Sequence, residues 1–270
     1  MRTRMFERLA AGATAYGAFT DINQPEIAEI AGAIGLDFIC IDMMMGAVDW
    51  NTSSRITLAA ERHGITPAIR LPAFPWAGSR LAIDRHISAD IVRAVAGGAQ
   101  AIFVSLETPE QVQAALLPAA SDHRRVYLPA FEFEAHGNAL EKDSVTTPPE
   151  RAMLFPLIES QLAIDLLDEI LAVPGLEGIF LGMGDLSVIL GHPNDYAHPD
   201  LIAFVQDVIN RAAPHDVCVF VNIHGRAGLE DVATAVREYE VMGARGIFVP
   251  RDSAILLRYY RDLLARLRGQ

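Results

Sequence analysis

Two acidic side chains, Glu159 and Asp185, each follow a short apolar stretch of the kind that forms a buried strand. Hard divalent cations such as Mg²⁺ and Mn²⁺ prefer oxygen ligands, and they commonly take one or two carboxylates with water and substrate at the other positions. We therefore expect Glu159 and Asp185 to bind a divalent metal. The alternative is that each carboxylate only caps the helix that follows it.

Three further polar residues lie at the ends of other apolar stretches: Asp42, Arg70 and His224. A permanent cation such as Arg70 is costly inside an apolar strand unless it is paired. It could form a buried ion pair with Asp42 or Glu159. It could also hold the oxygen of a 2-oxo acid and stabilise the enolate that forms from it.

The chain contains a single lysine, Lys142, in a polar stretch. A Schiff-base mechanism needs a desolvated lysine on a strand, and the sequence offers no such residue. We therefore expect a metal ion, and not a covalent amine, to activate a carbonyl group.

Short β-type stretches alternate with segments of helical periodicity, which predicts repeated βα units and a parallel sheet. Eight such strands are expected at Tyr16–Phe19, Phe38–Asp42, Ala68–Leu71, Ala101–Ser105, Met153–Glu159, Gly178–Gly182, Cys218–Ile223 and Gly246–Pro250. Helices are expected at Pro25–Ile34, Leu162–Ala172, Pro199–Ala212 and Leu229–Gly243. Eight parallel strands in about 250 residues predict a (β/α)₈ barrel, an α/β TIM barrel whose active site lies at the carboxyl ends of the strands.

No linker rich in Gly and Ser interrupts this order, so we expect residues 1–270 to form one domain. The exception to the regular spacing is the polar segment 121–150, which is long enough to be a lid over the site. Its residues Glu132, Glu134 and His136 alternate and could bind a second metal, although solvated charge in a loop is far commoner.

Composition and net charge disfavour several classes of protein. The formal net charge of −12 disfavours binding to nucleic acid or to an anionic membrane surface. No apolar run approaches the roughly 20 residues needed to span a bilayer. The two cysteines lie in apolar stretches, and the arginine-rich N-terminus lacks the apolar block of a signal peptide. We therefore expect a cytoplasmic enzyme.

Most of the chain, from about Tyr16 to Leu264, resembles the HpcH/HpaI aldolases, which are metal-dependent class II pyruvate-type aldolases on a (β/α)₈ barrel. The closest blocks are Pro156-Leu157-Ile158-Glu159-Ser160 and Gly178-Ile179-Phe180-Leu181-Gly182-Met183-Gly184-Asp185-Leu186-Ser187, followed by Leu190-Gly191-His192 and His198-Pro199. The first two blocks look like the metal-ligand strand and the Gly-Pro-x-Asp-Leu-Ser turn of this family.

The resemblance implies that Glu159 and Asp185 are the metal ligands and that Arg70 contacts the carbonyl oxygen of the substrate. Mg²⁺ or Mn²⁺ is the expected metal, with Co²⁺ as a further option. The backbone around Gly184 would hold the substrate carboxylate, because glycines at 182 and 184 let the main chain approach closely. The family cleaves 4-hydroxy-2-oxo acids to pyruvate-like products and an aldehyde, or runs the reverse addition. It often forms homo-oligomers, as hexamers or trimers of dimers.

The sequence departs from the family pattern at three positions. The family's usual proton-transfer histidine is replaced by Met45, its usual Gln by Leu157, and the Pro of its Gly-Pro turn by Met183. These substitutions predict a more apolar mouth. The methionines could instead be flexible apolar filling, which is their usual role. A metal-bound hydroxide could take over part of the task of the missing histidine, because metals acidify bound water. His224 is our candidate for a replacement base and His86 is a weaker one, although a helix-entry or interface histidine is the commoner role for a residue placed like His224. Asp42 is a further catalytic candidate.

The leading hypothesis is a carbon–carbon lyase that forms a pyruvate-type enolate from a 4-hydroxy-2-oxo acid. The loss of the histidine keeps open a second hypothesis, a decarboxylase or isomerase of 2-oxo acids or a specialised biosynthetic condensing enzyme. A third hypothesis is a non-catalytic protein that binds 2-oxo acids, which the presence of Glu159, Asp185 and Arg70 argues against.

Overall fold

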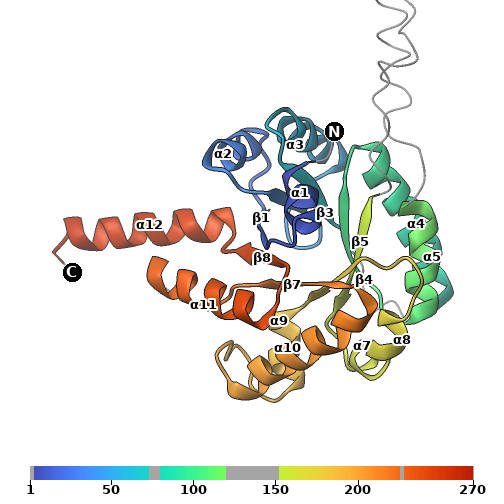
Figure 1. Cartoon of the computed structure of the whole chain (residues 1–270). Helices are drawn as coiled ribbons and strands as arrows, with labels where there is room; N and C mark the ends of the chain where they lie inside the picture. Colours follow the sequence, from blue (N-terminus) through green and yellow to red (C-terminus); the bar gives the residue numbers. More distant parts are fainter. Residues whose placement is uncertain (1–2, 73–79, 120–151, 226–227, 270) are drawn as a thin grey trace, which may run out of the picture.

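The computed structural model describes residues 3–72, 80–119, 152–225 and 228–269, with only the backbone for residues 80–86. Eight parallel strands close into a barrel in which each strand pairs with the next and β8 pairs with β1. The predicted (β/α)₈ barrel is confirmed (Figure 1). The strands are β1 (Ala15–Thr20), β2 (Phe38–Asp42), β3 (Thr66–Arg70), β4 (Ala101–Ser105), β5 (Met153–Ile158), β6 (Gly178–Leu181), β7 (Cys218–Asn222) and β8 (Gly246–Val249).

Helices surround the barrel and connect the strands (Figure 1). Those before β5 are α1 (Arg4–Ala10), α2 (Glu26–Ile34), α3 (Trp50–Arg62), α4 (Arg80–Ala96) and α5 (Pro109–Ala119). After β5 come α7 (Gln161–Asp165), α8 (Leu167–Leu171), α9 (Met183–Ile189), α10 (Pro199–Ala212), the 3₁₀ turn η2 (Ala213–His215), α11 (Leu229–Met242) and α12 (Asp252–Leu267). Within the described ranges, every helix is too short or too polar to cross a lipid bilayer.

One predicted helix differs from the structure. The segment Leu162–Ala172 forms two short helices, α7 and α8, that meet at Leu166, where φ is −101°. No glycine or proline marks this break. Both helices bury apolar side chains against the barrel, so tertiary packing and not local propensity decides the shape of this segment.

The barrel interior is filled by aromatic rings. Phe103 and Phe155 stack with centroids 4.6 Å apart, and the ring of Phe220 lies 4.5 Å from that of Phe155. A Cβ atom on Gly246 would lie only 2.0 Å from the Phe220 ring, so the glycine makes room for this packing. Met5 of α1 joins the same cluster from the N-terminal end of the chain. The interior is therefore a packed core, and a ligand site is expected at the carboxyl ends of the strands.

Candidate active site

The carboxylate of Glu159 lies directly beyond β5, beside the ends of β4 and β6. Ser105, the last residue of β4, donates a short hydrogen bond to its Oε1. Gly182, directly after β6, donates its backbone N–H to the carbonyl of Ile158 over 3.1 Å. A Cβ atom on residue 182 would lie 2.8 Å from Glu159 Oε2 and 2.5 Å from its Cβ. The Glu159 side chain therefore occupies space that only a glycine at 182 leaves open.

Asp185 lies in the first turn of α9, three residues beyond Gly182, and its side chain is exposed. Burial is the largest influence on the pKa of Glu159 and raises it, and the negative charges of Asp185 and Glu107 raise it further. The hydrogen bond from Ser105 and the charge of Arg70 act in the opposite direction. Acidic groups from three successive strand ends thus share one electrostatic neighbourhood, which a bound cation would stabilise.

The donor chemistry of this neighbourhood fits a hard divalent cation. Glu159 offers a half-buried carboxylate that is fixed by Ser105, and Asp185 offers an exposed one on the adjacent strand end. Mg²⁺ and Mn²⁺ favour such carboxylate oxygens and keep further positions for water and substrate. The structure thus places the two residues that the sequence predicts as metal ligands at adjacent strand ends, where the charge of Asp185 acts on Glu159.

Arg70, at the end of β3, is paired with Asp42, at the end of β2. The Nε of Arg70 donates to Asp42 Oδ1 over 3.0 Å, and its Nη2 forms a short ion pair with Asp42 Oδ2. Oδ1 also accepts the backbone N–H groups of Met44 and Met45 over 3.1 and 3.0 Å. Asp42 is fully buried. We therefore assign it the role of positioning Arg70, in place of the catalytic role that the sequence suggests.

The ion pair leaves Arg70 facing the mouth of the barrel. Its guanidinium carbon lies 4.5 Å from the centre of the Phe19 ring. Its charge lowers the pKa values of both Glu159 and His224, although it is not the largest influence on either. Arg70 therefore lies within electrostatic reach of the predicted metal ligand on one side and the predicted base on the other.

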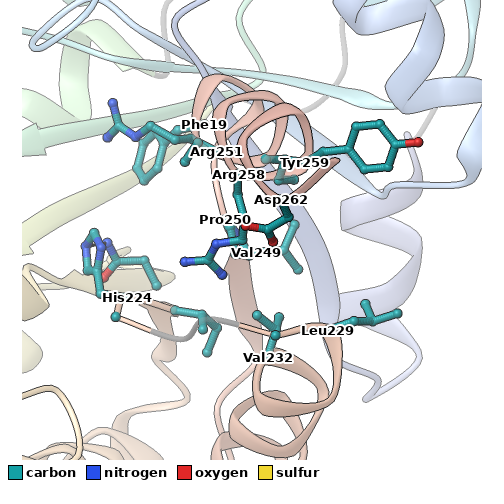
Figure 2. A pocket seen from close by; sticks show the side chains of 16 residues that line it. Phe19, His224, Leu229, Val232, Val249, Pro250, Arg251, Arg258, Tyr259 and Asp262 are labelled. Carbon is teal, nitrogen blue, oxygen red and sulfur yellow. Dashed lines mark hydrogen bonds between the residues drawn. The ribbon is translucent and has the colours of Figure 1, made fainter. Parts of the chain in front are cut away.

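His224 lies just after β7, near a cavity of about 540 Å³ between the barrel mouth, α11 and α12. Figure 2 shows it at one end of this cavity together with Phe19, while Leu229 and Tyr259 lie at the other end. Burial lowers the pKa of its imidazole, and the charges of Arg251 and Arg70 lower it further. His224 is therefore neutral at neutral pH. Its Nε2 forms a short hydrogen bond with the side-chain amide of Asn222, so Nδ1 is the ring nitrogen that remains for another partner.

The three residues that depart from the family pattern differ in how far their side chains are exposed. The side chain of Met45 is 70% exposed, whereas those of Leu157 and Met183 are 1% exposed. Leu157 packs in the aromatic barrel interior, and Met183 packs in the outer core between strands and helices. A Cβ atom on Gly184 would meet nothing within 4 Å. The expectation of a more apolar mouth is therefore corrected: of the three replacements only Met45 presents its side chain there, because the other two are taken up by core packing.

Sequence reasoning missed three residues of this site: Ser105, Glu107 and Arg251. Ser105 and Glu107 lie at the end of β4, and Arg251 lies just after β8 with its guanidinium 3.6 Å from Asp42 Oδ2. The active sites of such barrels lie at the carboxyl ends of the strands, and this rule would have found all three residues if it had been applied to all eight strands. The segment 121–150, with Glu132, Glu134 and His136, and the side chain of His86 lie outside the described residues.

Comparison with known proteins gives a consistent result. Residues 15–247 match the HpcH/HpaI aldolase/citrate lyase family. The chain belongs to this family. It is 26% identical to a hydroxypyruvate/pyruvate aldolase of Roseovarius nubinhibens, over 96% of this chain and 95% of that protein. It is also 26% identical to a 5-keto-4-deoxy-D-glucarate aldolase of Shigella dysenteriae, over 92% and 90% of the two chains.

The fold of this family extends over the whole chain. The structure of an HpcH/HpaI aldolase from Desulfitobacterium hafniense superimposes with a TM-score of 0.77, over 99% of this chain and 98% of that one, at 19% identity. As a member of the family, the chain is a divalent-metal-dependent class II aldolase, a carbon–carbon lyase. The expectation drawn from the sequence resemblance is confirmed at this level.

Proposed function

We propose that the chain cleaves a 4-hydroxy-2-oxo acid to an aldehyde and a pyruvate-type product, with Glu159 and Asp185 as ligands of Mg²⁺ or Mn²⁺. The relatives named above act as aldolases on hydroxypyruvate, pyruvate or a keto-deoxy sugar acid, as their names state. The observation that carries the proposal is the cluster of Glu159 and Asp185 at adjacent strand ends, within the electrostatic reach of Arg70.

The divalent ion, when bound, would polarise the carbonyl group of a 2-oxo acid and favour its enolate. The guanidinium of Arg70 would donate to the same oxygen as negative charge develops on it, because Asp42 already fixes its orientation. The open backbone at Gly184 leaves room for the substrate carboxylate. Met45, exposed at the mouth, would line the space for the rest of the substrate.

Cleavage requires one proton to leave the C4 hydroxyl group as the C3–C4 bond breaks, and one proton to reach C3 of the enolate. The neutral imidazole of His224 is the group that we propose for the first step. The mouth also contains Tyr196, whose ring centre lies 4.9 Å from that of His224. This contact and the hydrogen bond between its Nε2 and the side-chain amide of Asn222 hold the imidazole beside the strand ends, so a substrate hydroxyl would approach Nδ1.

Metal binding and turnover test the proposal together. Mn²⁺ titration followed by electron paramagnetic resonance should show binding to the unmodified chain and loss of that binding in Glu159→Gln and Asp185→Asn. Glu169→Gln, an exposed carboxylate on α8, is the matched control and should bind Mn²⁺ normally. Pyruvate release from a panel of 4-hydroxy-2-oxo acids should depend on the metal. Release of CO₂ from oxaloacetate without any aldol cleavage would contradict the lyase proposal.

We also propose that the chain works as a homo-oligomer in the cytoplasm. None of the residues of α12 is buried, and the helix projects from the barrel between α2 and α11 (Figure 1). Its exposed apolar side chains are Ile255, Leu256, Leu257, Tyr259, Tyr260, Leu263, Leu264 and Leu267. The flanking helices expose Ile30, Ile34 and Val241. Apolar surface of this extent is typical of a subunit interface, and a second copy offers the matching helix and flanks.

A further inference from the structure

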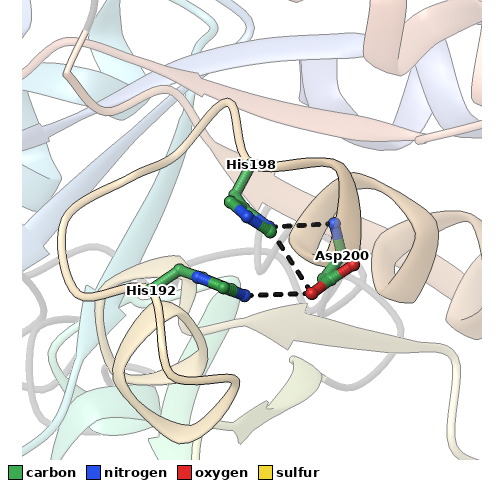
Figure 3. Close-up of side chains that lie close together, drawn as sticks. All are labelled: His192, His198 and Asp200. Carbon is green, nitrogen blue, oxygen red and sulfur yellow. Dashed lines mark hydrogen bonds and ion pairs between the residues drawn. The ribbon is translucent and has the colours of Figure 1, made fainter.

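A second group of metal-ligating side chains lies outside the site described above, in the connection between α9 and α10. His192 Nε2 lies 2.9 Å from Asp200 Oδ2, and His198 Nδ1 lies 3.6 Å from the same oxygen. The ligand atoms of all three residues lie within 4.8 Å of one another. Figure 3 shows the two imidazoles converging on the carboxylate.

We propose that His192, His198 and Asp200 bind a divalent transition metal of the Zn²⁺ type. Zn²⁺ bonds to imidazole nitrogen and carboxylate oxygen are about 2.0–2.2 Å long, so neighbouring ligand atoms in a tetrahedral site lie about 3.3–3.5 Å apart. The distances of 2.9 and 3.6 Å bracket this range, and small side-chain rotations would reach it.

The hydrogen bonding of His198 leaves its Nδ1 without a proton. This nitrogen accepts the backbone N–H of Asp200 over 3.2 Å, and because it has a single in-plane lone pair, a metal would have to replace this long hydrogen bond. Oδ2 of Asp200 lies 3.6 Å from the same nitrogen and would be the neighbouring ligand. The rings of His192 and His198 stack with centroids 3.3 Å apart, which places both imidazoles beside the carboxylate.

The loop that carries these residues is already ordered by its backbone. Ser187, fully buried in α9, donates to the carbonyl of Gly184 over 2.6 Å and accepts the N–H of Asn194 over 3.0 Å. The backbone N–H of His192 donates to the carbonyl of Ser187 over 2.8 Å. His192 is therefore fixed before a metal arrives, which lowers the entropic cost of binding.

A metal here would act on the mouth of the barrel through the loop. Tyr196 lies between the two histidines in sequence, and its ring covers Gly225 so closely that a Cβ atom there would lie 2.8 Å away. A metal that joins both ends of this loop would hold Tyr196 against His224. The two metal sites also differ in chemistry, because the nitrogen-rich ligand set favours Zn²⁺ whereas the carboxylate pair favours Mg²⁺ or Mn²⁺.

The test is calorimetric titration of Zn²⁺ into the full chain that carries Glu159→Gln and Asp185→Asn, in the presence of excess Mg²⁺. We expect one equivalent of Zn²⁺ to bind. Adding His192→Gln or His198→Asn should weaken binding at least tenfold. Asn at 198 retains a side-chain acceptor for the start of α10, so its effect reports the lost imidazole and not the lost cap. His215→Ala, an exposed histidine at the other end of α10, is the matched control and should leave binding unchanged.

A second measurement uses the unmodified chain. Zn²⁺ should slow the hydrogen exchange of the amides of residues 192–198, and His192→Gln should abolish this protection. The proposal is overturned if the double carboxylate variant binds no Zn²⁺, if both histidine variants bind it as tightly as their parent, or if Mg²⁺ displaces it. The first result would show that His192 and Asp200 form only an ion pair.

Discussion

At the scale of single residues, the proposed metal site depends on the glycine at 182 as well as on the two carboxylates. Gly182→Ala should displace the Glu159 side chain, because the new Cβ would lie 2.8 Å from Oε2, and should weaken Mn²⁺ binding at least tenfold. Gly184→Ala is the control, since its Cβ would meet nothing within 4 Å and Mn²⁺ affinity should stay unchanged. Equal Mn²⁺ affinity in the two variants would contradict this account of the site.

The orientation of Arg70 gives a second prediction at this scale. Arg70→Lys keeps the positive charge but loses the paired contact with Asp42, so kcat for aldol cleavage should fall about 10²–10³-fold, as on removal of one oxyanion donor. Steady-state kinetics would measure it, with Arg55→Lys on the exposed face of α3 as control. A variant that retains half of the activity would show that Arg70 has only a structural role.

Local sequence features indicate some residues of the candidate site, whereas others can be found only from three-dimensional packing. Glu159 and Arg70 are charged groups at the ends of apolar strands, so their cost of burial marks them out. Asp185 is exposed, and only its place just after a strand marks it. The tight approach of Ser105 to Glu159 depends on which strand ends are neighbours and on side-chain rotamers. The burial of Leu157 and Met183, likewise, follows from packing in three dimensions that no local pattern records.

At the scale of elements, the strands are predictable to within two residues because each is a short apolar stretch between helical segments. The sequence does not predict the break between α7 and α8 or the projection of α12. Both features depend on what these helices pack against in three dimensions. The amphipathic pattern of α12 is that of an ordinary barrel helix, yet the structure buries none of its residues.

The contact between β1 and α11 gives a pH prediction. Tyr16 donates a short hydrogen bond to Glu240, and burial together with this bond raises the pKa of the phenol from 10 to about 12. Because the neutral phenol is favoured in the folded state, its contribution to stability is complete below pH 10 and is lost as pH rises from about 10 to about 12.

The Tyr16→Phe variant tests this predicted loss of stability at alkaline pH. The variant should be less stable by about 1 kcal/mol at pH 8, the net value of a typical hydrogen bond, and its stability should fall less steeply between pH 10 and 12. Urea unfolding at a series of pH values would measure both effects. An identical alkaline slope in the two proteins would refute the assignment.

At the scale of the whole molecule, α12 predicts self-association. Leu257 is 70% exposed on α12, and Leu257→Asp should shift the chain toward the monomer in light scattering because it places a charge in the proposed interface. Leu117, 75% exposed on α5, provides the matched control Leu117→Asp, which should leave the assembly intact. A monomeric unmodified chain would contradict the proposal.

The central claim is that Glu159 and Asp185 hold a metal with which the barrel mouth stabilises a pyruvate-type enolate. Exchange of the methyl protons of pyruvate for deuterium in D₂O, followed by nuclear magnetic resonance, tests it without knowledge of the aldehyde partner. We predict exchange that requires added Mn²⁺ or Mg²⁺, stops with a chelator and is lost in Glu159→Gln. Exchange that is independent of the metal, or equal in the Glu159→Gln variant, would contradict the claim.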